Sequence, residues 1–231
     1  MTSPKRVLCL DTSTPTARVA LFDGAAQAIA GAEATAERHS QHVLKLVDEV
    51  LRSAGARPEA LAGIACGAGP GSFTGLRVGL AVAKGLALAT GAPLLLVSSL
   101  QALALDIARR APPGTRFVVP CIDAGKGEVY AFACALDGPV IAPGGEPWRL
   151  MPEALASRVA ELPAAVVAGN GADRHAAALG SGATVISVEG PSALSIGALA
   201  LPRLARGESD DLERAVPAYG RPPDITRPKS A

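Results

Sequence analysis

Aromatic side chains are scarce in this chain: phenylalanine, tyrosine and tryptophan together make up 3% of its 231 residues. Basic residues are not in excess either, since 22 lysines and arginines stand against 21 aspartates and glutamates, a formal net charge of +1. A protein that grips RNA by itself needs cations for the phosphates and aromatic rings for the bases. The composition therefore argues against a stand-alone RNA-binding module.

Metal-binding and redox motifs are also lacking. The four cysteines stand singly in apolar, strand-like stretches with no C-x-x-C spacing, at Cys9, Cys66, Cys121 and Cys134. This pattern is typical of buried free thiols. His39 and His42 are close together at the start of a predicted helix, but the third histidine, His175, is far away in sequence. Since Ser-His-Asp and H-E-x-x-H signatures are missing too, we predict no metal site and no catalytic residue.

Long hydrophobic runs are absent. The basic start Met1–Arg6 is followed by only a short apolar run, Val7–Leu10, before Asp11 interrupts it. The most apolar later stretch, Gly85–Val97, is broken by a glycine and a proline, and it is shorter than the roughly 20 residues that cross a bilayer. We therefore predict a cytoplasmic protein without a membrane segment.

The sequence does contain a clear succession of strands and helices. With 49% hydrophobic residues, a chain of this length can bury a large core. The first half predicts three strands, a helix, a strand, a helix, a strand and a helix, at Val7–Leu10, Arg18–Phe22, Ala28–Thr35, Ser40–Ala54, Ala62–Gly67, Thr74–Thr90, Leu94–Val97 and Leu100–Arg110. This order is typical of a ribonuclease-H-like α/β lobe.

A second, reduced lobe is expected after the break at Pro112-Pro113-Gly114. Its predicted strands and single helix lie at Phe117–Ile122, Glu128–Ala135, Pro152–Glu161 and Ala165–Ala168. We therefore divide the chain into a first lobe, 1–110, a smaller second lobe, 111–191, and a C-terminal region, 192–231. In that region the helix Ser192–Arg206 is expected to pack back on the first lobe, and the proline-rich tail Arg221–Ala231 to be poorly ordered.

Two polar turns are candidate ligand sites. Asp11-Thr12-Ser13-Thr14 ends the first strand, where a carboxylate and hydroxyls can hold a hydrated metal or a nucleotide phosphate, although the same residues also form ordinary turns. Within Gly69–Gly79, Gly71 and Ser72 precede a predicted helix, whose first N–H groups can bind an anion. The spacing fits neither a Walker A loop nor a dinucleotide loop, and a tight turn explains it as well.

Small residues form a stripe along the helix that follows. They recur every four residues, at Gly75, Gly79, Ala83 and Ala87. Such a stripe permits close approach of another backbone, which belongs either to a partner or to the chain's own sheet. Two further motifs also have two readings: Lys126, between two glycines, can reach a phosphate or sit in a tight hairpin, and Gly169-Asn170-Gly171 can be only a turn.

Several segments carry a family resemblance. They are Leu10–Thr14, His39–His42, Gly69–Gly79, Asp123-Ala124 with Glu128-Val129-Tyr130, and Arg221–Asp224. Through these segments nearly the whole chain resembles the TsaB family, also called YeaZ, of the glycoprotease-like (Gcp-like) superfamily. One departure is that many relatives have an arginine after Asp123-Ala124, whereas here Gly125 precedes the cation, Lys126.

The resemblance implies a two-lobed fold of the sugar-kinase, heat-shock-protein and actin type (ASKHA). It also implies a role in transferring threonylcarbamoyl to N6 of the adenosine beside the anticodon, in tRNAs that read codons beginning with A. In that family the subunit is a non-catalytic partner of the catalytic subunit TsaD, together with the ATPase TsaE. It reaches tRNA only through the complex and has no cofactor of its own, with ATP or ADP held at a composite site.

Two candidate residue sets follow from the motifs and the resemblance together. The candidate partner interface comprises Gly75, Gly79, Ala83, His39 and His42. The candidate nucleotide contacts are Asp11, Thr12, Ser13, Gly71, Ser72 and Asp123. Where the catalytic relative has a metal-binding H-L-E-G-H helix, this chain has a run from Ser99 to Leu103, and neither of these two residues can replace a histidine ligand.

Two enzymatic functions stand as alternatives. One is an ATP-dependent small-molecule kinase or ATPase of the same fold, suggested by Asp11 and Asp123. The other is a glycopeptidase, for which the sequence offers neither a metal triad nor a nucleophile with its base. In the absence of a partner, the small-residue helix face predicts a homodimer.

Overall fold

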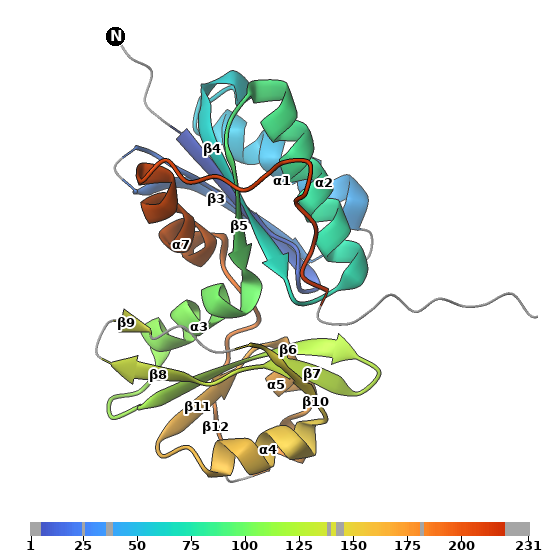
Figure 1. Cartoon of the computed structure of the whole chain (residues 1–231), viewed down its shortest axis with the longest axis vertical. Coiled ribbons are helices and arrows are strands. Elements are labelled where there is room, and N and C mark those ends of the chain that lie inside the picture. Colours follow the sequence, from blue (N-terminus) through green and yellow to red (C-terminus); the bar gives the residue numbers. More distant parts are fainter. Residues whose placement is uncertain are drawn as a thin grey trace, which may run out of the picture.

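The computed structural model describes residues 6–24, 26–35, 39–137, 140–141, 146–180 and 183–219. They form two β-sheets, the first above the second in Figure 1, with helix α3 (Ser99–Arg110) between them. The tail Arg221–Ala231 and its family motif lie outside the described residues. The lobe boundaries at 110 and 191 stay predictions.

The elements of the first sheet follow one another along the chain in the predicted ribonuclease-H-like succession, and its strands lie side by side in the order β3-β2-β1-β4-β5. Its strands are β1 (Arg6–Asp11), β2 (Thr16–Phe22), β3 (Ala28–Thr35), β4 (Leu61–Gly69) and β5 (Leu94–Ser98). The first three form an antiparallel meander, and β4 and β5 run parallel to β1. A 3-10 turn, η1 (Pro58–Ala60), leads into β4.

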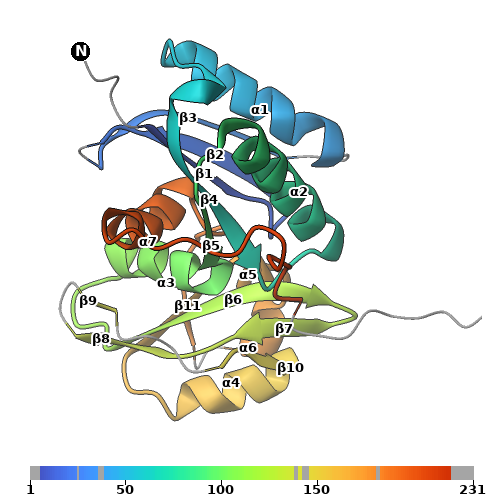
Figure 2. The same cartoon turned by 45° about the horizontal axis from the view of Figure 1, so that its top comes forward.

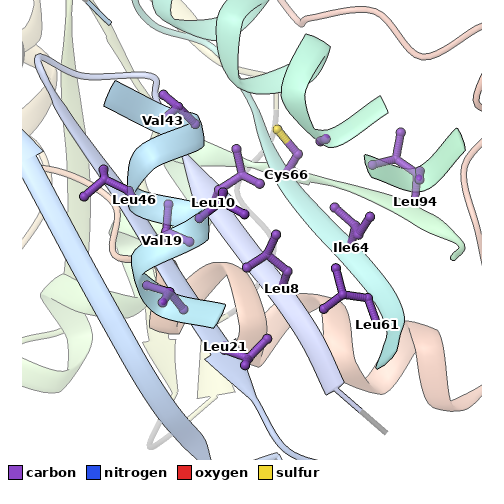
Figure 3. Close-up of a cluster of buried hydrophobic side chains, with 14 of the residues drawn as sticks. Leu8, Leu10, Val19, Leu21, Val43, Leu46, Leu61, Ile64, Cys66 and Leu94 are labelled. Carbon is purple, nitrogen blue, oxygen red and sulfur yellow. The ribbon is translucent and has the colours of Figure 1, made fainter. Parts of the chain in front are cut away.

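Helices cover both faces of this sheet. α1 (His39–Ser53) and α2 (Phe73–Thr90) lie on one face, and α7 (Ala193–Ala205) lies with α3 on the other (Figures 1 and 2). Along β1, Leu8 and Leu10 pack toward α1 and α2, in the core drawn in Figure 3. Val7 and Cys9 alternate with them and pack toward α7. The uninterrupted apolar run of β1 follows from this burial on both faces.

The second sheet repeats the arrangement of the first, in the order β10-β7-β6-β11-β12. Its elements are β6 (Phe117–Gly125), β7 (Glu128–Ala131), β8 (Cys134–Asp137), β9 (Val140–Ile141), β10 (Trp148–Leu150), α4 (Pro152–Ala160), β11 (Ala165–Ala168), α5 (Asn170–Arg174), α6 (Ala176–Leu179) and β12 (Thr184–Val185). As around β1, the central strand β6 has antiparallel neighbours on one side and parallel ones on the other.

The strand predicted at Glu128–Ala135 is wrong, because the structure divides it into β7 and β8. β7 pairs with one end of β6, as far as Cys121, and β8 pairs with the other end, at Phe117 and Val118. Pro120 lies between these two pairings and has no N–H group for the ladder. The pairing therefore breaks there and resumes beyond it.

The free cysteines predicted from the sequence are confirmed, since all four thiols are buried and none forms a disulfide. Burial raises the pKa of the Cys121 thiol to about 12, with Asp123 and Asp173 acting in the same direction. Burial likewise raises the pKa of Cys9 and of Cys66. The raised pKa values keep Cys9, Cys66 and Cys121 in the weakly nucleophilic thiol form.

Residues 208–219, the C-terminal strap, return to the first lobe after α7. At the outer edge of β5, Asp210 N donates to Leu94 O at 2.8 Å, and Leu96 N donates to Asp210 Oδ2 at 2.7 Å. The strap then crosses toward the start of α2, drawn in red in Figures 1 and 2, and Ala218 N donates to Ala68 O at 2.8 Å. The free edge of β5 is therefore covered by a segment that follows the second sheet in sequence.

The small-residue stripe of α2 packs on the chain's own sheet. Its four members are all buried within this single chain: Gly75, Gly79, Ala83 and Ala87. A Cβ atom on Gly79 would overlap Thr12 Oγ1 at the end of β1. The interface prediction for Gly75, Gly79 and Ala83 is therefore wrong, because all three residues are buried within this chain, the two glycines against Thr12.

The opposite side of α2 is open. Gly85 is exposed, and a Cβ atom built on it meets nothing within 4 Å. Among the described residues, α2 is the one helix long and apolar enough to cross a membrane, but Leu76 and Leu80 are buried on the sheet, as in the core helix of a globular domain.

Two glycine substitutions in α2 should therefore have opposite effects on stability. Gly79→Ala should lower the free energy of unfolding by about 1–3 kcal/mol, because the added methyl group collides with the buried Thr12. Gly85→Ala should raise it by about 0.5–1 kcal/mol, since it restricts the unfolded chain at an open helical position. Urea unfolding measures both, and a stabilising Gly79→Ala would contradict the packing described above.

Candidate functional site

A buried carboxylate holds the β1–β2 turn from inside. Asp11 is 1% exposed, and Ser13 donates to its Oδ1 from both N and Oγ, at 2.9 and 2.6 Å. Ser99 Oγ, at the first residue of α3, donates to Oδ2 at 2.6 Å. Burial raises the pKa of Asp11, although these hydrogen bonds act in the opposite direction. The carboxylate thus joins three segments of the first lobe.

The glycine-rich turn between β4 and α2 lies directly on the β1–β2 turn. Ser72 N donates to Ser13 O at 2.7 Å, and a Cβ atom on Gly71 would overlap that same carbonyl. Thr12 Oγ1 donates to Gly75 O at 2.8 Å, which fixes the first turn of α2. Ser72 caps this helix by accepting from Gly75 N at 3.2 Å. The chain's own turn therefore covers the backbone that a phosphate at the β1–β2 turn would contact.

A cleft of about 300 Å³ opens beside these turns, between the two sheets. Four of the six predicted nucleotide contacts meet there: Ser13, Gly71, Ser72 and Asp123. The other two, Asp11 and Thr12, do not line the cleft and are buried. A larger groove of about 890 Å³ runs along β2, β3 and residues 187–194, but it contains none of the candidate residues.

Asp123 lies on the second-lobe wall of the cleft, and both its carboxylate and its backbone N–H form hydrogen bonds. Its Oδ2 accepts from Arg174 Nη1 at 2.8 Å, and its backbone N donates to Asn170 Oδ1 at 3.2 Å. Asn170 is the first residue of α5, so the segment at Gly169–Gly171 is a helix start and not only a turn. Gly169 has a φ of 123°, and a Cβ atom there would overlap Cys121 O, so a glycine lets α5 approach β6.

The histidines are dispersed. His39 is the first residue of α1, and His42 is exposed on the same helix. His175 lies in the second lobe, with Nε2 3.7 Å from Asp123 Oδ1. Within the described part of the chain, no three His, Cys, Asp or Glu side chains form a group that can hold a metal ion.

Ser99 and Leu103 stand where the resemblance places the histidine ligands of the catalytic relative. Ser99 is fully buried and accepts from Gly69 N at 3.1 Å, in addition to donating to Asp11. Leu103 is fully buried in the second-lobe core and approaches Gly169. Ser99 therefore joins segments of the first lobe, and Leu103 packs α3 against the second lobe.

Tyr219 is a cleft residue that gave no signal in the sequence. Tyr219, in the strap, accepts at its OH from Arg77 Nε at 2.9 Å, and its carbonyl accepts from Tyr130 OH at 2.9 Å. Asn170 was noted only as part of a turn. Tyr130 appeared only as part of a family motif. Strap and cleft meet through contacts between residues far apart in sequence, which local patterns do not reveal.

Replacing Asp11 with alanine should lower the free energy of unfolding by about 2–4 kcal/mol, because it leaves Ser13 and Ser99 with buried donors that have no acceptor. Asp11→Asn, which keeps one acceptor oxygen, is the matched control and should lose less. An Asp11→Ala variant as stable as the wild type in urea would contradict this structural role.

The same residue predicts a dependence of stability on pH. Because the folded-state pKa of Asp11 is raised above its ordinary value of 3.8, the folded protein holds that proton more tightly than the unfolded chain does. The contribution of Asp11 to stability is therefore complete below pH 3.8 and declines as the pH rises through the folded-state pKa. The free-energy difference between the wild type and Asp11→Asn, measured over a pH series, should show this decline.

Comparison with known proteins supports a family assignment. A family model described as tRNA N6-adenosine threonylcarbamoyltransferase (TsaD) matches residues 32–143. The tRNA threonylcarbamoyladenosine biosynthesis protein TsaB of Escherichia coli is 39% identical over 126 residues, 54% of this chain and 53% of that protein. The match therefore spans about half the length of this curated relative.

Solved structures match over a greater length. The activator of the 2-hydroxyisocaproyl-CoA dehydratase from Clostridium difficile, solved with bound ADPNP, shares only the fold, at 10% identity and a TM-score of 0.51 over 89% of this chain and 99% of that one. YeaZ from Pseudomonas aeruginosa has 32% sequence identity and a TM-score of 0.78, and the match covers 93% of this chain and 99% of that one. The predicted two-lobed actin-like fold is thereby confirmed, and the chain belongs to the TsaB (YeaZ) family.

Proposed function

We propose that this chain is a non-catalytic scaffolding and activating subunit in the transfer of threonylcarbamoyl to N6 of the adenosine beside the anticodon of tRNA. Its partners are a TsaD-like catalytic subunit, with which it forms a heterodimer, and a TsaE-like ATPase. The observation that carries the proposal is the position of Ser99 and Leu103. Both occupy the ligand positions of the catalytic relative, and both are buried in structural contacts.

The outer surface of α1 and α2 is the proposed partner interface. The two helices lie side by side on the side of the first sheet that faces away from the second lobe (Figures 1 and 2). Leu44 on α1 is 55% exposed and Leu88 on α2 is 77% exposed, and Ala81 and Gly85 are exposed beside Leu88 on α2. Exposed apolar residues on adjacent helices are a typical docking surface for a helical partner.

Gly85 gives this surface a specific feature. A glycine inside a helix costs roughly 0.5–1 kcal/mol relative to alanine, and no atom of the described residues approaches the open side of Gly85. A backbone of a second protein, packing closely against α2, explains why a side chain is missing there. In the absence of the catalytic subunit, we expect the same face to pair two copies of this chain.

Gly85→Arg should weaken binding of the TsaD-like subunit at least tenfold while the isolated chain stays folded, because the arginine projects into open space in the monomer. Ala154→Arg, at an exposed position of α4 in the second lobe, is the matched control and should bind normally. Titration calorimetry with the purified partner measures both. Unchanged binding by Gly85→Arg would place the interface elsewhere.

Nucleotide belongs, in this proposal, to a composite site in the assembled complex. The backbone of the β1–β2 turn, which the sequence makes a candidate phosphate contact, is covered by Gly71 and Ser72. We therefore expect the isolated chain neither to bind ATP or ADP nor to turn over ATP. ATP turnover by the purified chain alone, lost in the Asp11→Asn variant, would favour the kinase alternative.

The proposed function as a whole is tested by reconstituting tRNA modification from the purified subunits, with and without this chain. Product should form only when the chain is present. Product formed at the same rate without it would overturn the scaffolding and activating role.

A further inference from the structure

We propose that the C-terminal strap is a latch that holds the second lobe closed over the cleft. Tyr219, at the end of the strap, is fixed on the first lobe and accepts a hydrogen bond from the second. Release of that bond lets the lobes move apart and widens the approach to the predicted nucleotide contacts that line the cleft, such as Ser72 and Asp123. The latch belongs to the isolated chain and does not depend on the proposed partners.

The two chain crossings between the lobes lie away from the cleft. The chain passes to the second lobe after α3, at 111–116, and returns before α7, at 186–192. Arg110 and Ser192, at these crossings, both line the larger groove, which shares no lining residue with the cleft. Asp106 on α3 fixes the returning segment, because its Oδ2 accepts from Ser192 N at 2.7 Å. A turn of one lobe about the crossings would therefore change the width of the cleft.

The end of the strap is bound to the first lobe. Ala218 N donates to Ala68 O at 2.8 Å, at the end of β4. The Tyr219 hydroxyl accepts from Arg77 Nε at 2.9 Å, and the ring centroids of Tyr219 and Phe73 are 4.8 Å apart. The Arg77 guanidinium also lies 3.9 Å from the centroid of the Phe73 ring. Since Arg77 and Phe73 both belong to α2, Tyr219 moves with the first lobe.

The bond from the second lobe comes from Tyr130 on β7. Its hydroxyl donates to the backbone O of Tyr219 at 2.9 Å, and Figure 2 shows the red end of the strap beside β7. Tyr130 is 2% exposed and packs in the second-lobe core, so it moves with the second sheet. Both tyrosines line the cleft. The hydrogen bond between them therefore crosses from one lobe to the other at the cleft itself.

A latch of this kind is reversible. The net contribution of one hydrogen bond to a folded structure corresponds to a change of about two- to tenfold in an equilibrium constant. The bond between Tyr130 and Tyr219 therefore favours the closed arrangement without making it permanent. Its loss should raise the population of open molecules by that factor.

The decisive variant is Tyr130→Phe in the isolated chain, because it removes the hydroxyl and keeps the buried ring. Spin labels at two exposed positions, Gln27→Cys in the first lobe and Ala154→Cys in the second, report the distance between the lobes by pulsed electron paramagnetic resonance. The four native cysteines are buried, which protects them from labelling. The fraction of molecules with a longer distance should rise about two- to tenfold. Arg77→Ala, which frees the Tyr219 side chain from α2, should act in the same direction.

The matched control variant is Thr90→Val, which removes a hydroxyl whose hydrogen bonds stay within the first lobe and should leave the distances unchanged. The control label pair is Gln27→Cys with Glu59→Cys, both exposed in the first lobe. Unchanged distances between the lobes in Tyr130→Phe and Arg77→Ala would overturn the latch, even if the melting temperature fell. A change between Gln27→Cys and Glu59→Cys would also overturn it, because the first lobe itself would then have loosened.

Discussion

The contact between two turns, β1–β2 and β4–α2, is the constraint on which the rest of the structure depends. Glycine at positions 71, 75 and 79 lets the second turn approach the first until backbone meets backbone, and the buried Asp11 carboxylate fixes the first turn from below. One arrangement thereby has three results. It anchors α2 on the sheet, shapes the first-lobe wall of the cleft, and covers the backbone of the β1–β2 turn.

Much of the fold could be predicted from the sequence because both faces of the central strands are apolar. β1 has no polar residue between Val7 and Leu10, and this fixes it as an interior strand. The order of strands and helices in the first lobe follows from such runs. The shortest strands, β9 and β12, have two residues each, too few for any periodic pattern. The break between β7 and β8 depends on Pro120, which lies in a different strand.

The residues of the candidate site could likewise be predicted only in part from the sequence. Ser13, Gly71, Ser72 and Asp123 converge on the cleft as the motifs suggest, because strand ends and helix starts meet at one edge of a sheet. The sequence could not show whether the stripe on α2 packs against a partner or against the chain's own sheet, since small side chains permit either. The contact of Gly75 and Gly79 with the buried Thr12 shows that it packs on the chain's own sheet. Tyr219 could not be predicted, because its role comes from contacts with Arg77 and Tyr130, more than eighty residues away.

The strap has a consequence for how the protein is made. Its hydrogen bonds to Leu94 and Leu96 close the outer edge of β5, and α7 covers the back of the same sheet. Both segments emerge from the ribosome only after the entire second sheet has been synthesised. During that interval α3 is the one helix in place on that apolar face and the β5 edge is unpaired, and exposed apolar faces and free edges are features through which nascent chains aggregate. The first lobe is therefore the first to be synthesised and the last to be completed.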